Sequence, residues 1–311
     1  MNFPSINQYL DDDDTLVMAN EDSRVGVHIP DIISENSSGF RNAMRTRAPV
    51  LPLMLSCLFQ SQKSVKSITH NPKLGKQEIS GQALVALEEY AKSLGISKIG
   101  YTKVDRDMIF RDKGILYENA IVFLMEMNID SIVTAPSKTA IKEIFRTYNA
   151  LGIIVNKVSE HLRASGFNAM AGPAIGGDVS YVPLAQKAGL GVIGKHGLLI
   201  TDEDFGPSLR IAAVYTDIEN LPVATENPHL WVREFCESCN ICVRNCPAGA
   251  IYEHSIAING NPNTRQCIDN AKCAVPFANE YGCTVCVKSC AFFKGDYHKI
   301  KTAFNKKKQK Q

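Results

Sequence analysis

The sequence has no large excess of charge of either sign. Its 34 Lys and Arg residues nearly balance 32 Asp and Glu residues, which gives a formal net charge of +2. Non-specific attraction to nucleic acid or to an anionic membrane requires a strongly positive surface. We therefore expect neither nucleic acid nor a membrane surface as a partner, and partners must be inferred from individual sites.

The sequence also lacks secretion and membrane signals. Its N-terminus has no apolar signal-peptide core and no twin arginine. The longest early apolar run, residues 49–59, is shorter than a bilayer requires. We therefore expect a cytoplasmic protein without a membrane span. Cysteines in that reducing setting bind metal more often than they form disulfides.

The chain of 311 residues has room for two modest domains, and its 45% hydrophobic and 21% charged residues are typical of globular proteins. Apolar residues at helical spacing alternate with apolar strand-like runs after residue 80, which predicts an α/β domain. The predicted helices cover residues 81–95, 140–165 and 183–189. The predicted strands cover residues 96–104, 119–127, 196–201 and 209–218, with a turn at DEDFGP between the last two.

Four regions follow from this pattern. Residues 1–79 lack clear periodicity and are interpreted as an N-terminal extension, and residues 80–228 form the α/β domain. A linker rich in Pro, Asn and Glu near its end leads to a cysteine-rich module at residues 229–296. The basic tail at residues 297–311 is predicted to be a solvated, disordered end rather than a nucleic-acid-binding segment.

The cysteine-rich module carries the strongest chemical signal. Cys57 stands alone, and the other nine cysteines lie between Cys236 and Cys290. The first group has the spacing C-x-x-C-x-x-C-x-x-x-C-P, in which three thiolates bind one iron–sulfur cubane and the fourth binds a second. The sequence therefore predicts two [4Fe–4S] clusters in a ferredoxin-like module. The expected ligands are Cys236, Cys239, Cys242 and Cys290 for the first cluster, and Cys246, Cys273, Cys283 and Cys286 for the second.

Other uses of these cysteines explain the pattern less well. A structural zinc site built from two Cys-x-x-Cys pairs leaves three thiols unexplained, disulfides lack a secretory context, and a metal-free thiol cluster would oxidise. One ligand position stays open between Cys273 and Cys267, and the shorter loop from Cys273 to Cys283 favours Cys273. Cys57 is expected to be a buried hydrophobic residue.

A glycine-rich stretch resembles two nucleotide-binding signatures. Gly189, Gly191 and Gly194 spell G-x-G-x-x-G, and Lys195 completes G-x-x-x-x-G-K. Both signatures need a strand before the glycines and a helix after them, whereas here the predicted order is reversed and His196 replaces the required Ser or Thr. We therefore reject a nucleotide loop. The glycines permit close approach to a flat partner beside the Lys195 cation, or they form a helix cap and turn in which His196 is a turn residue.

At this point the sequence resembles a known family. The stretch at residues 181–222, with AGLG-x-x-GKHGLLIT and FGP-x-x-R, followed by the two cysteine groups, resembles the reductive dehalogenases and, more distantly, the epoxyqueuosine reductases. The resemblance covers about residues 80–293. It implies a nitroreductase-like α+β domain that holds a corrinoid (cobalamin) beside a module with two [4Fe–4S] clusters. Cofactor contacts are then expected at Gly189, Gly191, Gly194, Lys195 and His196.

The resemblance also implies a function. The clusters would pass electrons from an external donor of the ferredoxin or flavodoxin type to the corrinoid, which would reduce a small organic substrate. Reduction of this kind delivers a proton as well as electrons. By resemblance, Tyr148 would be the proton donor and Lys195 its basic partner, although the spacing of Tyr148 with Leu151 and Val155 equally predicts a core-facing tyrosine.

The sequence departs from the relatives at several positions. Epoxyqueuosine reductases carry an aspartate before a Tyr-His pair, whereas residues 146–149 here read Arg-Thr-Tyr-Asn, which argues against queuosine chemistry. Ala291 rather than proline follows Cys290, and no twin arginine is present, so we expect a non-exported relative whose substrate need not be a halide. The alternative functions are a corrinoid-free electron-transfer protein of the ferredoxin type and an iron–sulfur sensor.

Overall fold

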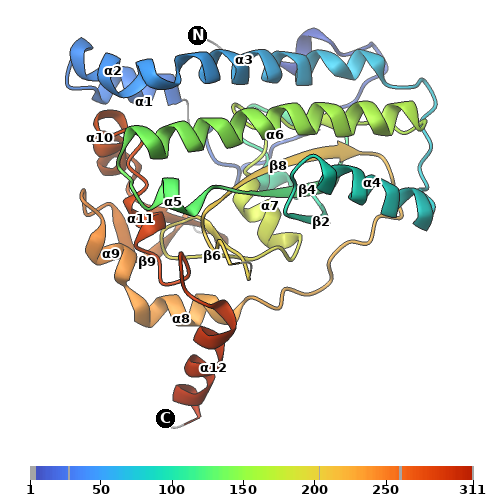
Figure 1. The fold of residues 1–311 in the computed structure, drawn as a ribbon. Helices are drawn as coiled ribbons and strands as arrows, with labels where there is room; N and C mark the ends of the chain where they lie inside the picture. The colour runs from blue at the N-terminus through green and yellow to red at the C-terminus, as the bar shows by residue number, and fades with distance from the viewer. Residues whose placement is uncertain (1–4, 27–28, 203, 259–260, 310–311) are drawn as a thin grey trace.

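The computed structural model describes residues 5–26, 29–202, 204–258 and 261–309 (Figure 1). The start of the predicted N-terminal extension, Glu203 in the predicted DEDFGP turn, and the last two residues of the basic tail lie outside the described residues. Within the described part, no helix combines the length and the apolar character needed to cross a bilayer.

The centre of the molecule is a four-stranded antiparallel sheet in the order β2-β4-β8-β5. The strands are β2 (Lys98–Lys103), β4 (Asn119–Glu126), β8 (Leu209–Thr216) and β5 (Met170–Ala171). Every residue of β4 except Glu126 is buried, which confirms the predicted fully buried strand. The predicted mixed α/β fold is therefore confirmed, with strands where the apolar runs indicated them.

The two faces of β4 enter different cores, because successive side chains of a strand point to opposite sides. Ile121 and Phe123 face helices α4 (Gly81–Ser93) and α6 (Lys138–Ala164). Val122 faces α7 (Tyr181–Lys187) on the other side. Helices thus cover both faces of the sheet, which explains why the strand is apolar without alternation.

The predicted helix boundaries follow from their capping residues. The Ser80 and Ser137 hydroxyls accept hydrogen bonds from the backbone N–H groups of the first turns of α4 and α6, at 3.2 and 3.0 Å. Gly95 and Gly166 then follow the C-terminal ends with φ of +105° and +89°, a conformation that glycine adopts without strain. The sequence located both ends of these helices.

The N-terminal region forms a helical layer. It contains α1 (Ile29–Asn36), α2 (Phe40–Arg47) and α3 (Leu51–Lys66), and α3 lies alongside α6 (Figure 1). The contact is polar and buried, since Ser64 Oγ lies 3.1 Å from Asn156 Oδ1 and Asn156 Nδ2 donates to the Gln60 carbonyl at 3.1 Å. Further along, the side chain of Asn42 in α2 donates to Asn279 Oδ1 at 2.7 Å. Residues 29–66 therefore link the sheet domain to the cysteine module.

Short elements complete the domain. Two small antiparallel pairs join β1 (Val17–Met18) to β3 (Gly114–Ile115), and β6 (Val192–Ile193) to β7 (Leu199–Ile200); α5 (Ile129–Ile132) precedes α6. The predicted strand at residues 196–201 is thus confirmed as β7. It pairs with β6 in a hairpin that carries the Gly194-Lys195-His196 turn.

The cysteine module follows the linker at residues 220–228. Its elements are α8 (Trp231–Cys239), α9 (Ile241–Asn245), the hairpin β9 (Ile251–Ile258) and β10 (Asn261–Ile268), α10 (Asn270–Asn279), and α11 (Val285–Lys288). Gly206 of the sheet domain packs so closely on the Phe292 carbonyl that a Cβ there would collide with it. The module is therefore packed against the sheet domain rather than tethered to it.

The predicted disorder of the C-terminal end is wrong for the described residues. Residues Tyr297–Lys308 form helix α12, which projects from the module in Figure 1. Asp296 caps its first turn by accepting from Lys299 N at 2.9 Å, and Trp231 Nε1 donates to Tyr297 Oη at 2.8 Å. The hydrogen bond between Trp231 and Tyr297 holds the start of the helix against the module. The lysine-rich composition of the segment did not predict this contact.

Candidate functional site

The first set of thiols comes together from two distant parts of the chain. Burial raises the pKa of the Cys290 thiol, and the neighbouring thiols of Cys236, Cys242 and Cys239 raise it further. Burial likewise raises the pKa of Cys236 to about 11, with contributions from Cys242 and Cys239. The end of the second cysteine group therefore lies among the first three cysteines of the first group.

The second set shows the reciprocal arrangement. Burial raises the pKa of Cys273, and the nearby thiols of Cys283 and Cys246 add to the shift. Burial also raises the pKa of Cys286 to about 12, and its neighbouring thiols are Cys283, Cys273, Cys242 and Cys246. Cys246, the fourth cysteine of the first group, thus lies near Cys273 and Cys286 of the second group. Because Cys286 also neighbours Cys242 of the first set, the two sets adjoin, and the division of the eight thiols between two clusters stays a prediction of the crossing rule.

Cys267 lies in a different environment. Burial raises the pKa of its thiol, and the charged neighbours that oppose this shift are Arg24, Arg265 and Arg233. No other thiol contributes to its shift, in contrast to Cys273. Cys267 lines a cavity of about 740 Å³, which Cys236 of the first set also lines.

The surroundings of the thiols suit an iron–sulfur cluster. The cysteines of the first set line one cavity with Lys195 and His196. Backbone hydrogen bonds from Lys195 and Phe292 favour the thiolates of Cys236 and Cys290, and Ala250 N lies 3.3 Å from Cys246 Sγ. Within the described residues, no three Cys, His, Asp or Glu side chains converge on a single ion. A cubane needs no such convergence, because each of its irons takes a separate thiolate.

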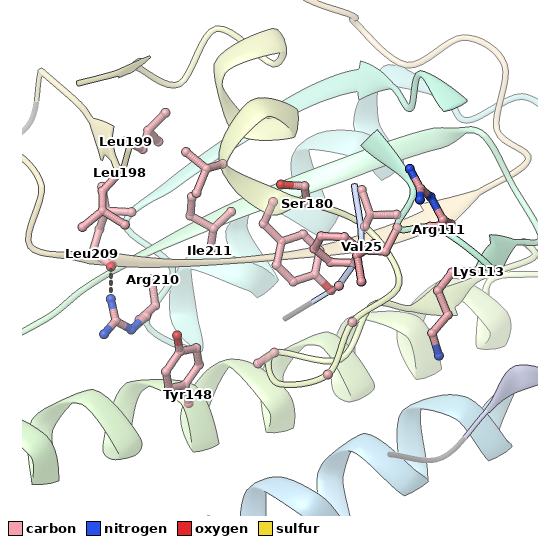
Figure 2. Close-up of a pocket in the computed structure, with 18 of the residues that line it drawn as sticks. Val25, Arg111, Lys113, Tyr148, Ser180, Leu198, Leu199, Leu209, Arg210 and Ile211 are labelled. Carbon is pink, nitrogen blue, oxygen red and sulfur yellow. Dashed lines mark hydrogen bonds between the residues drawn. The ribbon is translucent and has the colours of Figure 1, made fainter. Parts of the chain in front are cut away.

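A second feature is an open pocket of about 910 Å³ between α6, β8 and the β6–β7 hairpin (Figure 2). Tyr148 points from α6 toward Arg210 of β8, and the Arg210 guanidinium carbon lies 4.8 Å from the centre of the Tyr148 ring. Arg210 Nη1 donates to the Leu209 carbonyl at 3.2 Å, while its Nε is buried without a partner in the described structure. A half-buried phenol and a guanidinium therefore face the same pocket.

The pocket clarifies the two interpretations of Tyr148. Its ring packs against apolar residues of two core clusters, as the helical spacing indicated, and it also lines the pocket, as the resemblance implied. The basic side chain beside it is Arg210, which the sequence analysis did not single out. The FGP-x-x-R block, whose last residue is Arg210, was the available signal.

The structure does not bring Lys195 to Tyr148. The Lys195 side chain is 5% exposed, and its Nζ lies 2.6 Å from Asn240 Oδ1 and 3.9 Å from Glu237. It lines the cavity of the first thiol set and the 740 Å³ cavity, and it is absent from the lining of the Tyr148 pocket. Lys195 therefore lies beside the first thiol set rather than beside Tyr148.

The glycines of the same stretch serve the hairpin. Gly189 and Gly191 have φ of +71° and +158°, and a Cβ on Gly191 would collide with the Ile200 carbonyl. A Cβ on Gly194 would lie 2.6 Å from Ile200 Cδ1. The close approach that the glycines indicated is thus to neighbouring protein atoms. Helix α7 precedes the glycines, β6 lies between Gly191 and Gly194, and β7 follows, which agrees with the rejection of a nucleotide loop.

The loop that closes the far end of the pocket contains a buried carboxyl group. Burial raises the pKa of Asp178 from 3.8 to about 6, while Lys113, 3.7 Å away, lowers it by a smaller amount. Folding therefore favours the neutral carboxyl, and its contribution to stability is lost as the pH rises through about 6.

Asp178→Asn is accordingly expected to stabilise the protein more at higher pH. The gain in unfolding free energy over wild type should grow by about 1 kcal/mol between about pH 5 and about pH 8. Denaturant unfolding of both proteins across this range measures it. Asp112→Asn, at an exposed position, is the control, and a difference that does not change with pH would contradict the prediction.

Comparisons with known proteins place these observations in context. The model of the 4Fe-4S binding domain family matches residues 229–252. A tetrachloroethene reductive dehalogenase of Desulfitobacterium hafniense is 34% identical over 213 residues, which cover 64% of this chain and 37% of that protein. The corresponding enzyme of Sulfurospirillum multivorans is 32% identical over 192 residues, 58% of this chain and 36% of its own length. An epoxyqueuosine reductase of Listeria monocytogenes is 31% identical over 128 residues, 39% of this chain and 32% of its own length.

Solved structures show the same relationship at the level of the fold. A catabolic reductive dehalogenase superposes with a TM-score of 0.71 at 18% identity, covering 92% of this chain and 44% of that one. A second structure, reported for B12-dependent dehalogenation, gives 0.66 at 18% identity over 96% of this chain and 46% of that one. The resemblance to reductive dehalogenases, with epoxyqueuosine reductases as more distant relatives, is therefore confirmed. The chain spans less than half the length of these relatives.

Proposed function

We propose that this chain, a relative of the reductive dehalogenases, is an iron–sulfur oxidoreductase that passes electrons from two [4Fe–4S] clusters to a corrinoid, which reduces a small organic substrate. One observation carries the proposal: two sets of thiols with cluster-binding composition lie beside a pocket that presents a tyrosine and an arginine. The relatives that share both sequence and fold are oxidoreductases, which supports an enzymatic role.

The thiols and the pocket are contiguous. Cys286 and Cys290 pack in one apolar cluster with Tyr148 and Leu198, and Leu198 also lines the pocket. The β6–β7 hairpin continues this contact, since it places Lys195 at the first thiol set and Leu198 at the pocket. Electrons leaving the clusters would therefore cross only a thin layer of packed side chains to reach the pocket.

The pocket residues fit a large, flat cofactor. The volume of about 910 Å³ lies at the upper end for ligand sites. Leu198, Leu199 and Ile211 supply apolar surface, and Gly176 and Gly177 line the same pocket. These residues would hold the corrinoid, which supplies a redox-active cobalt when bound. Gly194, Lys195 and His196 would act at the junction between the pocket and the first cluster.

Tyr148 is the proposed proton donor in this arrangement. Its phenol faces the pocket from a rigid helix, and Arg210 stacks over its ring, which restricts the orientation of both side chains. The guanidinium adds a permanent positive charge, which would attract a halide or another electron-rich substrate group. Small organic molecules, rather than nucleic acid, are therefore the proposed substrate class, with a ferredoxin- or flavodoxin-type protein as the electron donor.

Metal analysis of anaerobically purified protein, prepared with added cobalamin, tests the proposal. We expect about eight irons with matching sulfide and about one cobalt per chain, together with halide release from small organohalides such as tetrachloroethene. Iron and sulfide without retained cobalt would refute the corrinoid role and leave the alternative, a corrinoid-free electron-transfer protein. Zinc or no metal at the thiols would refute both functions.

A further inference from the structure

His196 is a buried polar side chain beside the first thiol set. It is 3% exposed, and it lines the same small cavity as these cysteines. The cysteines in the cavity lining are Cys236, Cys239, Cys242 and Cys290. The position of His196 in the β6–β7 turn brings it there, because β6 packs on α8, which carries Cys236.

The hydrogen bonds of His196 define its protonation. The backbone N–H of Leu198 donates to His196 Nδ1 at 3.1 Å, so Nδ1 carries a lone pair and the ring proton resides on Nε2. An imidazolium would carry a proton on Nδ1 and could not accept this bond, so the ring is neutral. The Nε2–H group nevertheless has no acceptor among the described residues. A buried donor without a partner destabilises the fold, so an acceptor is expected in the cavity.

The other polar side chains of this cavity are already engaged. Lys195 Nζ bonds to Asn240 Oδ1, and Asn240 Nδ2 donates to Glu253 at 3.3 Å. Among the side chains that line the cavity, His196 is therefore the neutral donor that remains for whatever the cysteines hold.

We propose that His196 Nε2–H donates a hydrogen bond to a sulfur atom of the first cluster and thereby raises the reduction potential of that cluster above the value it would otherwise have. The inference rests on the proposed iron–sulfur function. Reduction adds negative charge to the cluster sulfurs, and a donor hydrogen bond stabilises that charge. His196 is thus a tuning residue that favours electron arrival at the cluster nearest to it.

An EPR-monitored redox titration of the purified, cluster-loaded protein tests this inference. His196→Leu removes the donor while keeping an apolar side chain of similar bulk, and we expect the midpoint potential of one cluster to fall while the other stays unchanged. His196→Gln retains an N–H donor and should restore part of the loss. Phe235→Leu alters the packing of the same cavity without removing a donor, and it should leave both potentials near wild type.

Two results would overturn the inference. One is an unchanged pair of potentials in His196→Leu, and the other is an equal fall in His196→Leu and Phe235→Leu, which would indicate a packing effect. If the variants lose their clusters, the hydrogen bond can be tested on the wild-type protein. Protein labelled with ¹⁵N-histidine should show a nitrogen coupling to one reduced cluster in pulsed EPR. Absence of this coupling would also refute the hydrogen bond. Wild-type protein without iron and sulfide would instead refute the proposed function itself.

Discussion

Replacing Cys273 with alanine is expected to remove about half of the iron from the protein. The Cys273 thiol lies with those of Cys246, Cys283 and Cys286, and a cubane deprived of one of its thiolates is lost or degraded. Iron and sulfide should therefore fall from about eight to about four atoms of each per chain. Iron analysis and EPR of the reduced protein, prepared without oxygen, measure the change.

Cys267→Ala is the matched control, since it removes a cysteine of the same module. Arginines rather than other thiols are the charged neighbours of its thiol, so the iron content should stay at the wild-type level. The reverse result, with iron lost from Cys267→Ala and retained in Cys273→Ala, would assign the fourth ligand of the second cluster to Cys267 and show that the module rearranges around the metal.

The parts of the fold that the sequence predicted are those where local pattern and tertiary environment agree. Strand β4 is apolar throughout because helices cover both of its faces. Helix α6 alternates buried and exposed residues with the helical period and ends at Ala164, two residues before Gly166. The cysteine spacing predicted that thiols from the two cysteine groups approach one another, as Cys290 does with Cys236, Cys239 and Cys242.

Helix α3 was not predicted because its amphipathic pattern is inverted. Leu51, Leu55 and Phe59 are more than half exposed, whereas Ser61 and Ser64 are buried. The buried serines satisfy their hydroxyls with neighbouring segments: Ser64 Oγ donates to Asn156 Oδ1 of α6 at 3.1 Å, and Ser61 Oγ donates to the Ile175 carbonyl, between β5 and α7, at 2.9 Å. A search for an amphipathic helix with apolar residues on its buried face therefore does not detect α3.

The candidate site shows a similar division. Tyr148 followed from the resemblance, but its cationic neighbour did not, because Arg210 reaches it through the packing of β8 on α6. Lys195 lies at the thiols for the same kind of reason, since the β6–β7 hairpin turns it toward α8. The position of Lys195 next to the glycines did not show which cavity its side chain lines. Contacts between side chains of different helices and strands depend on tertiary packing, and the spacing of residues along the sequence does not predict them.

Tyr148→Phe is expected to lower turnover of an organohalide by about 10²–10⁴-fold, the usual contribution of a positioned general acid. Phenylalanine retains the ring over which Arg210 lies and the apolar contacts of Tyr148, so only the phenolic hydroxyl group is removed. Iron and cobalt contents should therefore equal those of the wild type. The measurement is halide release under anaerobic conditions with a chemical reductant, normalised to bound cobalt.

Tyr90→Phe provides the matched control, because Tyr90 lies on α4, stacks on His161, and does not line the pocket. It should turn over at the wild-type rate. Unchanged turnover in Tyr148→Phe would exclude the phenol as proton donor and direct attention to Ser180, another hydroxyl that lines the pocket.

Arg210→Lys then separates the effect of charge from that of geometry. Lysine keeps the positive charge but lacks the planar guanidinium that lies over the Tyr148 ring. A loss in Arg210→Lys comparable to that in Tyr148→Phe would show that orientation of the phenol, rather than charge alone, is what Arg210 provides.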